Sequence, residues 1–599
     1  MKRKRLIVLP ALLLIVALLL QGCTFSFFYP REPSGSFLST APASSGKPST
    51  DPAEPTEPAS YVPYTEYERP MQGTLPECRF SEMEYTRPDT DAIRSGFAEV
   101  QKLVEDDASL EEVLTRFDEV YTDYLYFTTM DSLAYIHYSL DLNDSFYDEE
   151  YNWCEAQSPL VSQAQEKCYV AMAQSPLRDD LEREYFTEGF FDFYDENQIY
   201  TKDRVVELMQ QESELETQYM ALQSDRTIEW EGEEVLVDDL FASDLDYFSL
   251  MDAYRLYYEK YNPLASDLFI RLIRVRREIA AELEYDSFAD FAYEYYYRRD
   301  YTPAQVSQYT ADIARELSPL YYTAAMNTYS QEMDTDETME LFRKTVYTFG
   351  GEIATAYEYM TAYELYDITE SSSKLPGSYM TYLNSYEMPF LYVSPTDTID
   401  DLLTVSHEFG HFVDGYVNCG ATDSIDCNEI FSQGLEFLTL GRAELSESER
   451  ALLTSSKLAD SVSVFLSQAS YAEFEQRAYE LPDEKLTAEG LNELFVECSE
   501  EFGMSFSGME DLIGMGWIDI QHFFIAPFYG ISYCVSNDAA LQIYQRELES
   551  GDGLALYRRL MELSGGNTIL NLLDEADMES PFAEGRMAEL ADFLQEHLD

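Results

Sequence analysis

Apolar residues recur at spacings of three and four along most of the chain beyond Pro76, and this feature constrains the fold more than any other. Such spacing places apolar side chains on one face of an α-helix, which then packs against other helices. The sequence therefore predicts a mainly α-helical body. The clearest predicted helices span residues 92–125, 205–224, 247–283, 304–330 and 336–365, the last interrupted at Gly350-Gly351.

One interval departs from the helical pattern. Residues 376–394 (PGSYMTYLNSYEMPFLYVS) carry Gly and Pro punctuation, then an apolar and aromatic run at 388–393. The interval predicts one or two strands in a small sheet. We expect the run at 388–393 to present an edge to which an extended peptide could add, and Gly377-Ser378 to let that backbone approach closely. The alternative is an ordinary hairpin without a binding role.

The N-terminus has the pattern of an export signal. Four positive residues at 2–5 precede an apolar run at 6–20, which is the length of a signal-peptide core and short for a membrane span. The run ends in LQGC at 20–23, which resembles the lipobox of bacterial lipoproteins. We therefore expect a signal peptide at 1–22, lipidation of Cys23, and an extracytoplasmic protein held to the cell membrane by that lipid. A plain secretory signal is the alternative.

The composition indicates a flexible tether and a strongly acidic chain. Residues 23–75 are rich in Pro, Ser and Thr, which predicts a flexible tether. Asp and Glu number 113 against 39 Lys and Arg, so the net charge is −74. Such a charge repels phosphate backbones, which excludes nucleic acid as a partner, and it would concentrate basic peptides near the surface.

The cysteine count leaves the disulfides open. Of eight cysteines, seven remain after Cys23, so at least one thiol is unpaired. Cys154 with Cys168, and Cys419 with Cys427, could each form a bridge or stay as separate buried thiols.

A predicted helix at 400–418 carries His407, Glu408 and His411 in the sequence HEFGH. Residues i and i+4 share a helix face, so the two imidazoles can bind one zinc ion, with Glu408 beside it as a base. With five histidines and 113 acidic residues in 599 positions, composition alone predicts roughly 0.01 occurrences of a His-acid-x-x-His pattern. Hydrolytic zinc sites usually have a third protein ligand. A second helical stretch from Cys427 offers Glu429 and Glu436, and periodicity cannot choose between them.

Three separated motifs resemble the thimet and oligoendopeptidase F family of zinc oligopeptidases. They are HEFGH with EIFSQGLE, KLPGSYMTYLNSYEMPFLYVS at 374–394, and HFFIAPFYGISY at 522–533. The resemblance implies a two-lobed helical body with a deep central channel for short peptides, and a small β-sheet beside a gluzincin-type active-site helix. It implies one zinc ion per chain, held by His407, His411 and Glu429, with Glu408 as the general base.

The third motif supplies candidate donors to the oxyanion that peptide hydrolysis generates: His522 with Tyr529 or Tyr533. The two tyrosines would share a face if this stretch were helical, which Pro527 opposes. The sequence departs from the family at Ile531, where a tyrosine is usual, and at Asp414, where a histidine is frequent. We expect Asp414 to support a metal ligand.

These features divide the chain into a helical N-terminal lobe at 76–370 and a metallopeptidase region at 371–599. The favoured function is a monomeric zinc endopeptidase acting on short peptides. One alternative is an exopeptidase, either a carboxypeptidase or a peptidyl-dipeptidase, with the same zinc chemistry. The other is a peptide-binding lipoprotein, which would not need Glu408.

Overall fold

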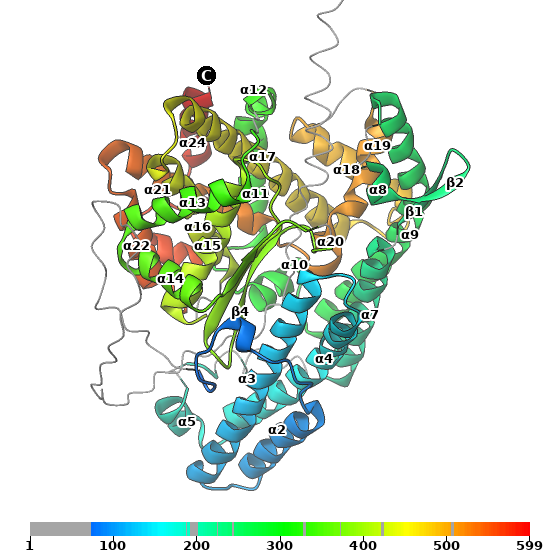
Figure 1. The fold of residues 1–599 in the computed structure, drawn as a ribbon. Helices are drawn as coiled ribbons and strands as arrows, with labels where there is room; N and C mark the ends of the chain where they lie inside the picture. The colour runs from blue at the N-terminus through cyan, green and yellow to red at the C-terminus, as the bar shows by residue number, and fades with distance from the viewer. Residues whose placement is uncertain are drawn as a thin grey trace, which may run out of the picture.

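The computed structural model describes residues 73–186, 189–191, 194, 202–224, 226–241, 245–327, 331–371, 373–420, 424–504 and 508–598. The predicted signal peptide, Cys23 and the tether up to residue 72 lie outside these residues. Within them the chain is mainly α-helical, as predicted (Figure 1). No helix in the described part of the chain is long and apolar enough to cross a membrane.

The helices before the three-stranded sheet are α2 (Thr90–Glu105), α3 (Leu110–Leu140), α4 (Ser145–Ala173), α5 (Arg178–Glu184), α7 (Asp203–Ser224), α8 (Val237–Phe241), α9 (Tyr247–Glu282), α10 (Phe288–Phe291), α11 (Pro303–Leu317), α12 (Tyr321–Asn327), α13 (Thr335–Phe349) and α14 (Gly351–Ala362). Short helical segments are η1 (Phe80–Glu82), the π-helix η2 (Ala292–Tyr296), η3 (Ser318–Leu320) and η4 (Gly516–Asp519).

The helices after the sheet are α15 (Asp401–Asn418), α16 (Ile425–Arg442), α17 (Glu447–Glu480), α18 (Ala488–Glu501), α19 (Glu510–Met515), α20 (Gln521–Ile525), α21 (Ile531–Ser550), α22 (Gly553–Leu563), α23 (Ile569–Glu575) and α24 (Arg586–Leu598). The strands are β1 (Thr227–Trp230) and β2 (Glu233–Leu236), which form a hairpin, and β3 (Tyr366–Ile368), β4 (Ser378–Leu383) and β5 (Met388–Val393).

Three of the five predicted helices are confirmed. The ranges 205–224 and 247–283 correspond to α7 and α9. The range 336–365 divides into α13 and α14 where expected, because Gly350 and Gly351 have φ of 66° and 58°, which glycine adopts without strain.

Two predicted ranges are wrong as single helices. The range 92–125 divides into α2 and α3, because Asp107 turns the chain at φ 54° and Ser109 starts a new helix through a capping box with Glu112. The range 304–330 breaks between α11 and α12 at η3, where Pro319 cannot donate a helical hydrogen bond. The long helices α4 and α17 were not predicted.

The predicted strand at 388–393 is β5, but its place in the sheet differs from the expectation. The strand order is β3-β5-β4, with β5 parallel to β3 and antiparallel to β4. All six β5 residues are buried, since both of its edges are paired and α15 packs against it. The edge strands are therefore β3 and β4, and β4 begins at Ser378 (Figure 1).

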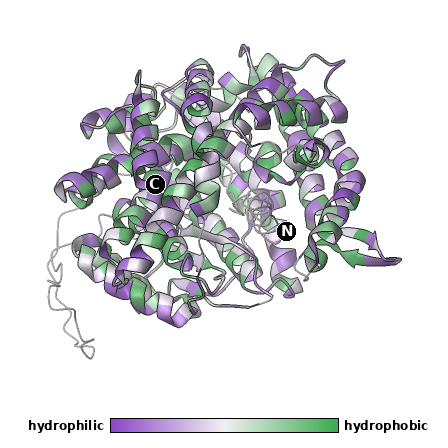
Figure 2. Cartoon of the chain, turned by 90° about the horizontal axis from the view of Figure 1, so that it is seen from above, coloured by the Kyte–Doolittle hydropathy of each residue, from purple (hydrophilic) through white to green (hydrophobic). Residues whose placement is uncertain are grey.

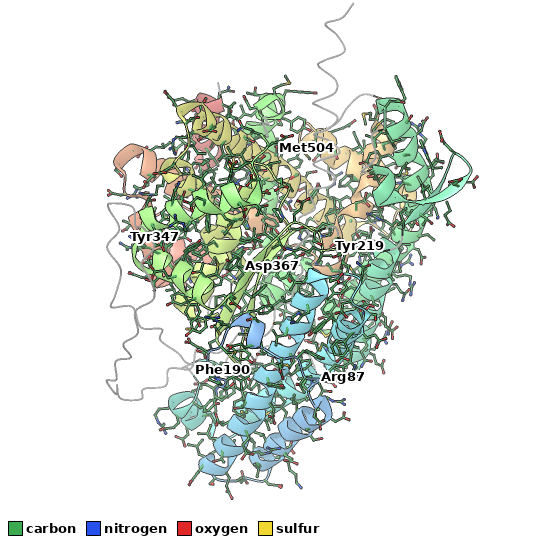
Figure 3. The ribbon with its side chains drawn as sticks, in the orientation of Figure 1. Arg87, Phe190, Tyr219, Tyr347, Asp367 and Met504 are labelled. Atoms are coloured by element: carbon green, nitrogen blue, oxygen red, sulfur yellow. The ribbon has the colours of Figure 1, made fainter. Side chains whose placement is uncertain are left out.

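A buried lysine fixes the start of this edge strand. Lys374 donates to Asp367 Oδ1 on β3 (2.6 Å) and to the carbonyl of Val393 at the end of β5 (2.9 Å). Asp367 is labelled in Figure 3, near the centre of that view. The lysine therefore ties the loop that leads into Ser378 to the two other strands.

Most helices carry hydrophilic and hydrophobic residues together, as amphipathic helices do (Figure 2). The main cluster of buried apolar residues runs from Met83 to Leu598 and so crosses the predicted boundary at 370/371. A smaller cluster belongs to α2–α5 and the residues up to Tyr194. The division at 370/371 stays a prediction.

No disulfide joins the seven cysteines that the structure describes. Cys154 and Cys168 lie on the same helix, α4, fourteen residues apart, which corresponds to about 21 Å of helix. A disulfide requires Cα atoms within about 7 Å. The interpretation as separate thiols is therefore correct for this pair.

Candidate metal centre

The site is built where α15 and α16 cross at close range. A β-carbon added at Gly410 would lie 2.3 Å from the carbonyl oxygen of Phe431, so only glycine lets the two backbones approach this closely. Asp401 stabilises the first turn of α15 by accepting hydrogen bonds from the amides of Thr396 and Thr398. The crossing places HEFGH opposite the first half of α16.

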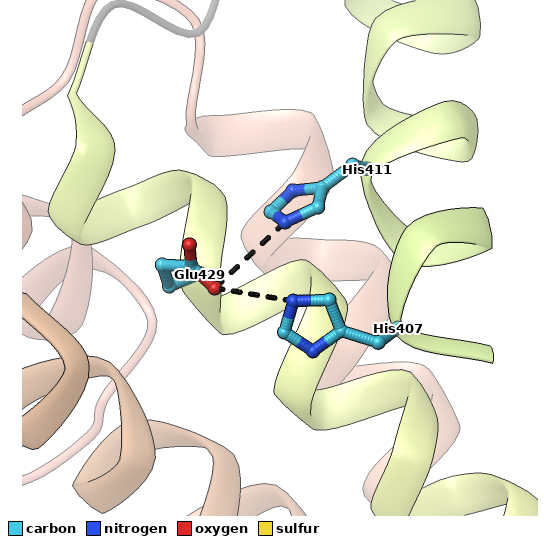
Figure 4. A group of neighbouring side chains, drawn as sticks. All are labelled: His407, His411 and Glu429. Carbon is cyan, nitrogen blue, oxygen red and sulfur yellow. Dashed lines mark ion pairs between the residues drawn. The ribbon is translucent and has the colours of Figure 1, made fainter. Parts of the chain in front are cut away.

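The structure brings His407, His411 and Glu429 together, with their candidate ligand atoms within 4.8 Å of one another (Figure 4). Glu429 Oε2 lies 3.6 Å from His407 Nε2 and 3.7 Å from His411 Nε2. Two imidazole nitrogens and one carboxylate oxygen are the donor set of many hydrolytic zinc sites. The three side chains therefore form a possible His-His-Glu metal site.

Glu436, the other candidate third ligand, has a different place. Its Oε1 lies 2.8 Å from His407 Nδ1, and its Oε2 lies 2.7 Å from Lys457 Nζ on α17. Burial alone would raise the pKa of Glu436, but Lys457 and His407 hold it below the usual value. An ionised carboxylate only accepts hydrogen bonds, so His407 Nδ1 donates to Glu436, and Nε2, which faces Glu429, is the ring nitrogen placed to bind a metal.

The sequence reasoning did not identify Lys457. It lies on another helix, 21 residues beyond Glu436, so no local spacing connects the two. The one available signal was the rarity of basic residues, since 39 Lys and Arg stand against 113 Asp and Glu in this chain.

Glu408 is fully buried beside this group, on the same helix. Its Oε1 accepts a hydrogen bond from Ser378 Oγ at the start of β4 (2.7 Å), and its buried Oε2 has no hydrogen-bond partner among the described residues. Burial raises the pKa of Glu408 to about 7, although His407 and Ser378 oppose the shift. One carboxylate oxygen is therefore held while the other can take a proton.

The third motif, residues 522–533, also lies beside the metal-ligand group. His522 lies on α20, Tyr529 lies between α20 and α21, and Tyr533 lies in the first turn of α21, so the stretch is not one helix. The His522 ring stacks on Tyr529 at 5.1 Å, and Tyr533 lies edge-on to Tyr529 at 5.0 Å. The Tyr529 hydroxyl donates to Glu429 Oε1 (3.2 Å). Burial lowers the pKa of His522 to about 4, so its ring is neutral near pH 7.

Asp414 is buried on α15, and its Oδ1 accepts a hydrogen bond from Asn418 (2.6 Å). Asn418 in turn contacts Ser564 at the end of α22 (3.1 Å). These contacts tie the end of α15 to α22, and support of a metal ligand by Asp414 stays a prediction.

Comparison with known proteins relates the chain to one family. The model of the Peptidase M3 N-terminal domain matches residues 80–199, and the model of Peptidase family M3 matches residues 344–592. Together the two matches cover more than half of the chain.

Two curated proteins are similar over shorter stretches. The chromosomal oligoendopeptidase F of Lactococcus lactis subsp. cremoris is 31% identical over 195 residues, which is 30% of this chain and 31% of that protein. An oligoendopeptidase F homolog of Borreliella burgdorferi is 26% identical over 225 residues, which is 35% of this chain and 37% of that protein. The similarity thus spans less than half the length of each relative.

Solved structures are similar over nearly their whole length. PZ peptidase A, solved with an inhibitor, has a TM-score of 0.74 and 22% identity, covering 87% of this chain and 99% of that one. Oligoendopeptidase F from Enterococcus faecium has a TM-score of 0.56 and 17% identity, covering 85% and 97%. At these identities, the likeness shows a common fold.

Proposed function

The chain belongs to peptidase family M3, and from this premise we propose that it is a zinc-dependent metalloendopeptidase that hydrolyses short oligopeptides outside the cytoplasm. The observation that carries the proposal is the convergence of His407, His411 and Glu429 beside a buried carboxylate, Glu408, that is not needed as a ligand. One zinc ion per chain would be held by these three residues, whose donor types suit it.

When bound, zinc would polarise the scissile carbonyl and lower the pKa of a water molecule. Glu408 is the general base: Ser378 orients one carboxylate oxygen, and the other takes the proton from the attacking water. Its raised pKa suits this task near neutral pH, since the protonated acid can then give the proton to the leaving amine.

The oxyanion receives hydrogen bonds from residues of the third motif. His522 is neutral and donates from one ring nitrogen. Because the Tyr529 hydroxyl is engaged with Glu429, Tyr533 is the favoured tyrosine donor, and Tyr529 orients the ligand. This assigns different tasks to two tyrosines that the sequence reasoning could not separate.

The substrate is an extended peptide that adds to the edge of the sheet at β4. Backbone hydrogen bonds to an edge strand hold peptides of many sequences. The position of β4 supports this, because the strand begins at Ser378, whose hydroxyl donates a hydrogen bond to the general base. A peptide along this edge would therefore pass beside Glu408.

The remaining parts of the proposal rest on the sequence. Cys23 carries a lipid that anchors the chain to the membrane of a bacterial cell, and the tether holds the monomeric body away from it. The acidic surface favours basic peptides.

The test compares the purified full-length protein with its Glu408→Gln variant on a mixture of short peptides, read by mass spectrometry. We expect internal cleavage by the wild type and a loss of about 10³-fold or more in turnover for the variant, since no other group takes the proton. Zinc content should be unchanged in Glu408→Gln, because its ligands are intact. Chelation should abolish cleavage and added zinc should restore it.

The control replaces a different buried carboxylate, Glu150 on α4, which pairs with Arg87. Glu150→Gln should keep its turnover. Release of terminal residues alone would instead indicate an exopeptidase, and bound peptides without cleavage would indicate a peptide-binding lipoprotein. Near wild-type turnover in Glu408→Gln would refute the assigned base.

A further inference from the structure

The segment between α20 and α21, residues 526–530, carries an unusual backbone conformation next to the site. We call it the hook loop. Phe528 has φ of 64°, a left-handed conformation that residues with a β-carbon adopt only when their surroundings enforce it. The next residue is Tyr529, which bonds to Glu429 and stacks on His522. The conformation of Phe528 therefore decides where Tyr529 lies.

Two buried side chains hold the hook loop at neighbouring backbone groups. Glu475 Oε1 on α17 accepts a hydrogen bond from the amide of Phe528 (2.9 Å). The Tyr297 hydroxyl, one residue beyond the π-helix η2, donates to the carbonyl of Pro527 (2.8 Å). π-Helical turns are rare and frequently occur at functional sites. The loop is thus held by an acceptor from one element and a donor from another.

A buried arginine anchors the chain that leads into the hook loop. Arg276 on α9 is fully buried, and it donates to the carbonyls of Phe523 and Phe524. Its remaining donors bond to Glu212 and Glu216 on α7 and to the hydroxyl of Tyr479 on α17. With this entry fixed, the hook loop has little freedom except at Phe528.

From these contacts we propose that Glu475 is a positioning residue, which together with Tyr297 holds the hook loop so that Tyr529 and His522 meet the metal-ligand group. The inference rests on the proposed peptidase function. It adds to that function a residue of α17, a helix that carries none of the three sequence motifs.

The chemistry of Glu475 suits a hydrogen-bond acceptor rather than an ion-pair partner. Burying a carboxyl group costs more free energy than burying an apolar side chain, and Glu475 bonds mainly to one backbone amide in return. We therefore expect the hydrogen bond to Phe528 to have a role beyond stability. Burial raises the pKa of Glu475 to about 8, although the Phe528 amide and two arginines oppose the shift. Near neutral pH the side chain is therefore largely a neutral acid, for which glutamine is a close substitute.

The experiment compares kcat and KM of the zinc-loaded full-length protein with those of Glu475→Ala and Glu475→Gln. In Glu475→Ala, Phe528 can leave the left-handed conformation, and we expect kcat to fall about 10²-fold with little change in KM. Glu475→Gln keeps the acceptor and should restore kcat to near the wild-type value. Tyr297→Phe, which keeps the ring, should lose kcat in the same manner but to a smaller extent.

The matched control is Tyr219→Phe. Tyr219 on α7, labelled in Figure 3, is also a buried tyrosine that donates to a backbone carbonyl, that of Ile518 (2.9 Å). Removal of this hydroxyl should leave kcat unchanged. A second readout is hydrogen exchange of the Phe528 amide, which should be faster in Glu475→Ala than in the wild type or Glu475→Gln.

The outcomes separate this inference from the proposed function. A wild-type protein that binds zinc but cleaves no peptide overturns both. An active wild type with unchanged kcat and unchanged Phe528 exchange in Glu475→Ala overturns the positioning role alone. Equal losses in Glu475→Ala and Glu475→Gln would also overturn it, since the hydrogen bond would then not be the cause.

Discussion

At the scale of single residues, burial decides the charge of His522, and this has a consequence for stability. The folded pKa is about 4, whereas the unfolded chain has the ordinary value of about 6.5. As the pH falls, the unfolded state takes up the proton first. The stability that neutral His522 contributes is therefore full above pH 6.5 and is lost as the pH falls through 4, by about 3 kcal/mol in all.

Chemical denaturation of metal-free protein between pH 7 and pH 4 measures this loss, with His522→Gln as the reference that has no titrating ring. The wild type should lose more stability than His522→Gln over this range. Equal losses would show that His522 is not buried as a neutral ring.

At the scale of elements, the crossing of α15 and α16 depends on Gly410. Alanine favours a helix over glycine by about 1 kcal/mol. However, the new β-carbon would lie 2.3 Å from the Phe431 carbonyl oxygen, and relieving this clash requires the backbone of α16 to move. We expect Gly410→Ala to destabilise the protein by about 1–3 kcal/mol. It should also weaken zinc binding, because His411 and Glu429 lie on the helices that are forced apart.

Gly441 in α16 is the matched control, since nothing lies within 4 Å of a β-carbon there. Gly441→Ala should keep its zinc, and its free energy of unfolding should rise by up to about 1 kcal/mol. Thermal denaturation and the metal content after dialysis measure both effects. Zinc retained by Gly410→Ala at the wild-type level would contradict the importance of this crossing.

At the scale of the whole molecule, the net charge of −74 should act on substrates before they bind. A surface of one sign raises the local concentration of oppositely charged ligands, and salt screens this effect. For a basic peptide, kcat/KM should fall roughly tenfold between about 0.01 M and 1 M salt. The same peptide with Gln in place of Lys and Arg should show little change. Equal salt dependence of the two peptides would rule out electrostatic attraction.

The sequence by itself determined the features that depend on near neighbours. Periods of three and four specified helices such as α7 and α9, and the apolar run at 388–393 specified β5 to the residue. The spacing of His407 and His411 placed two imidazoles on one helix face, because the geometry of a helix follows from residues within a turn of each other. The relative placement of two residues on one helix can therefore be predicted without knowing the fold.

The tertiary structure decided what depends on contacts between distant segments. Glu429 and Glu436 lie seven residues apart on one face of α16, so only the crossing at Gly410 puts Glu429 opposite both imidazoles and leaves Glu436 to His407 Nδ1. Strand pairing put β5 in the middle of the sheet and left β3 and β4 at its edges. Lys457 and Glu475 act from another helix. Periodicity shows which face of an element is apolar, but packing alone selects the residues that meet across two elements.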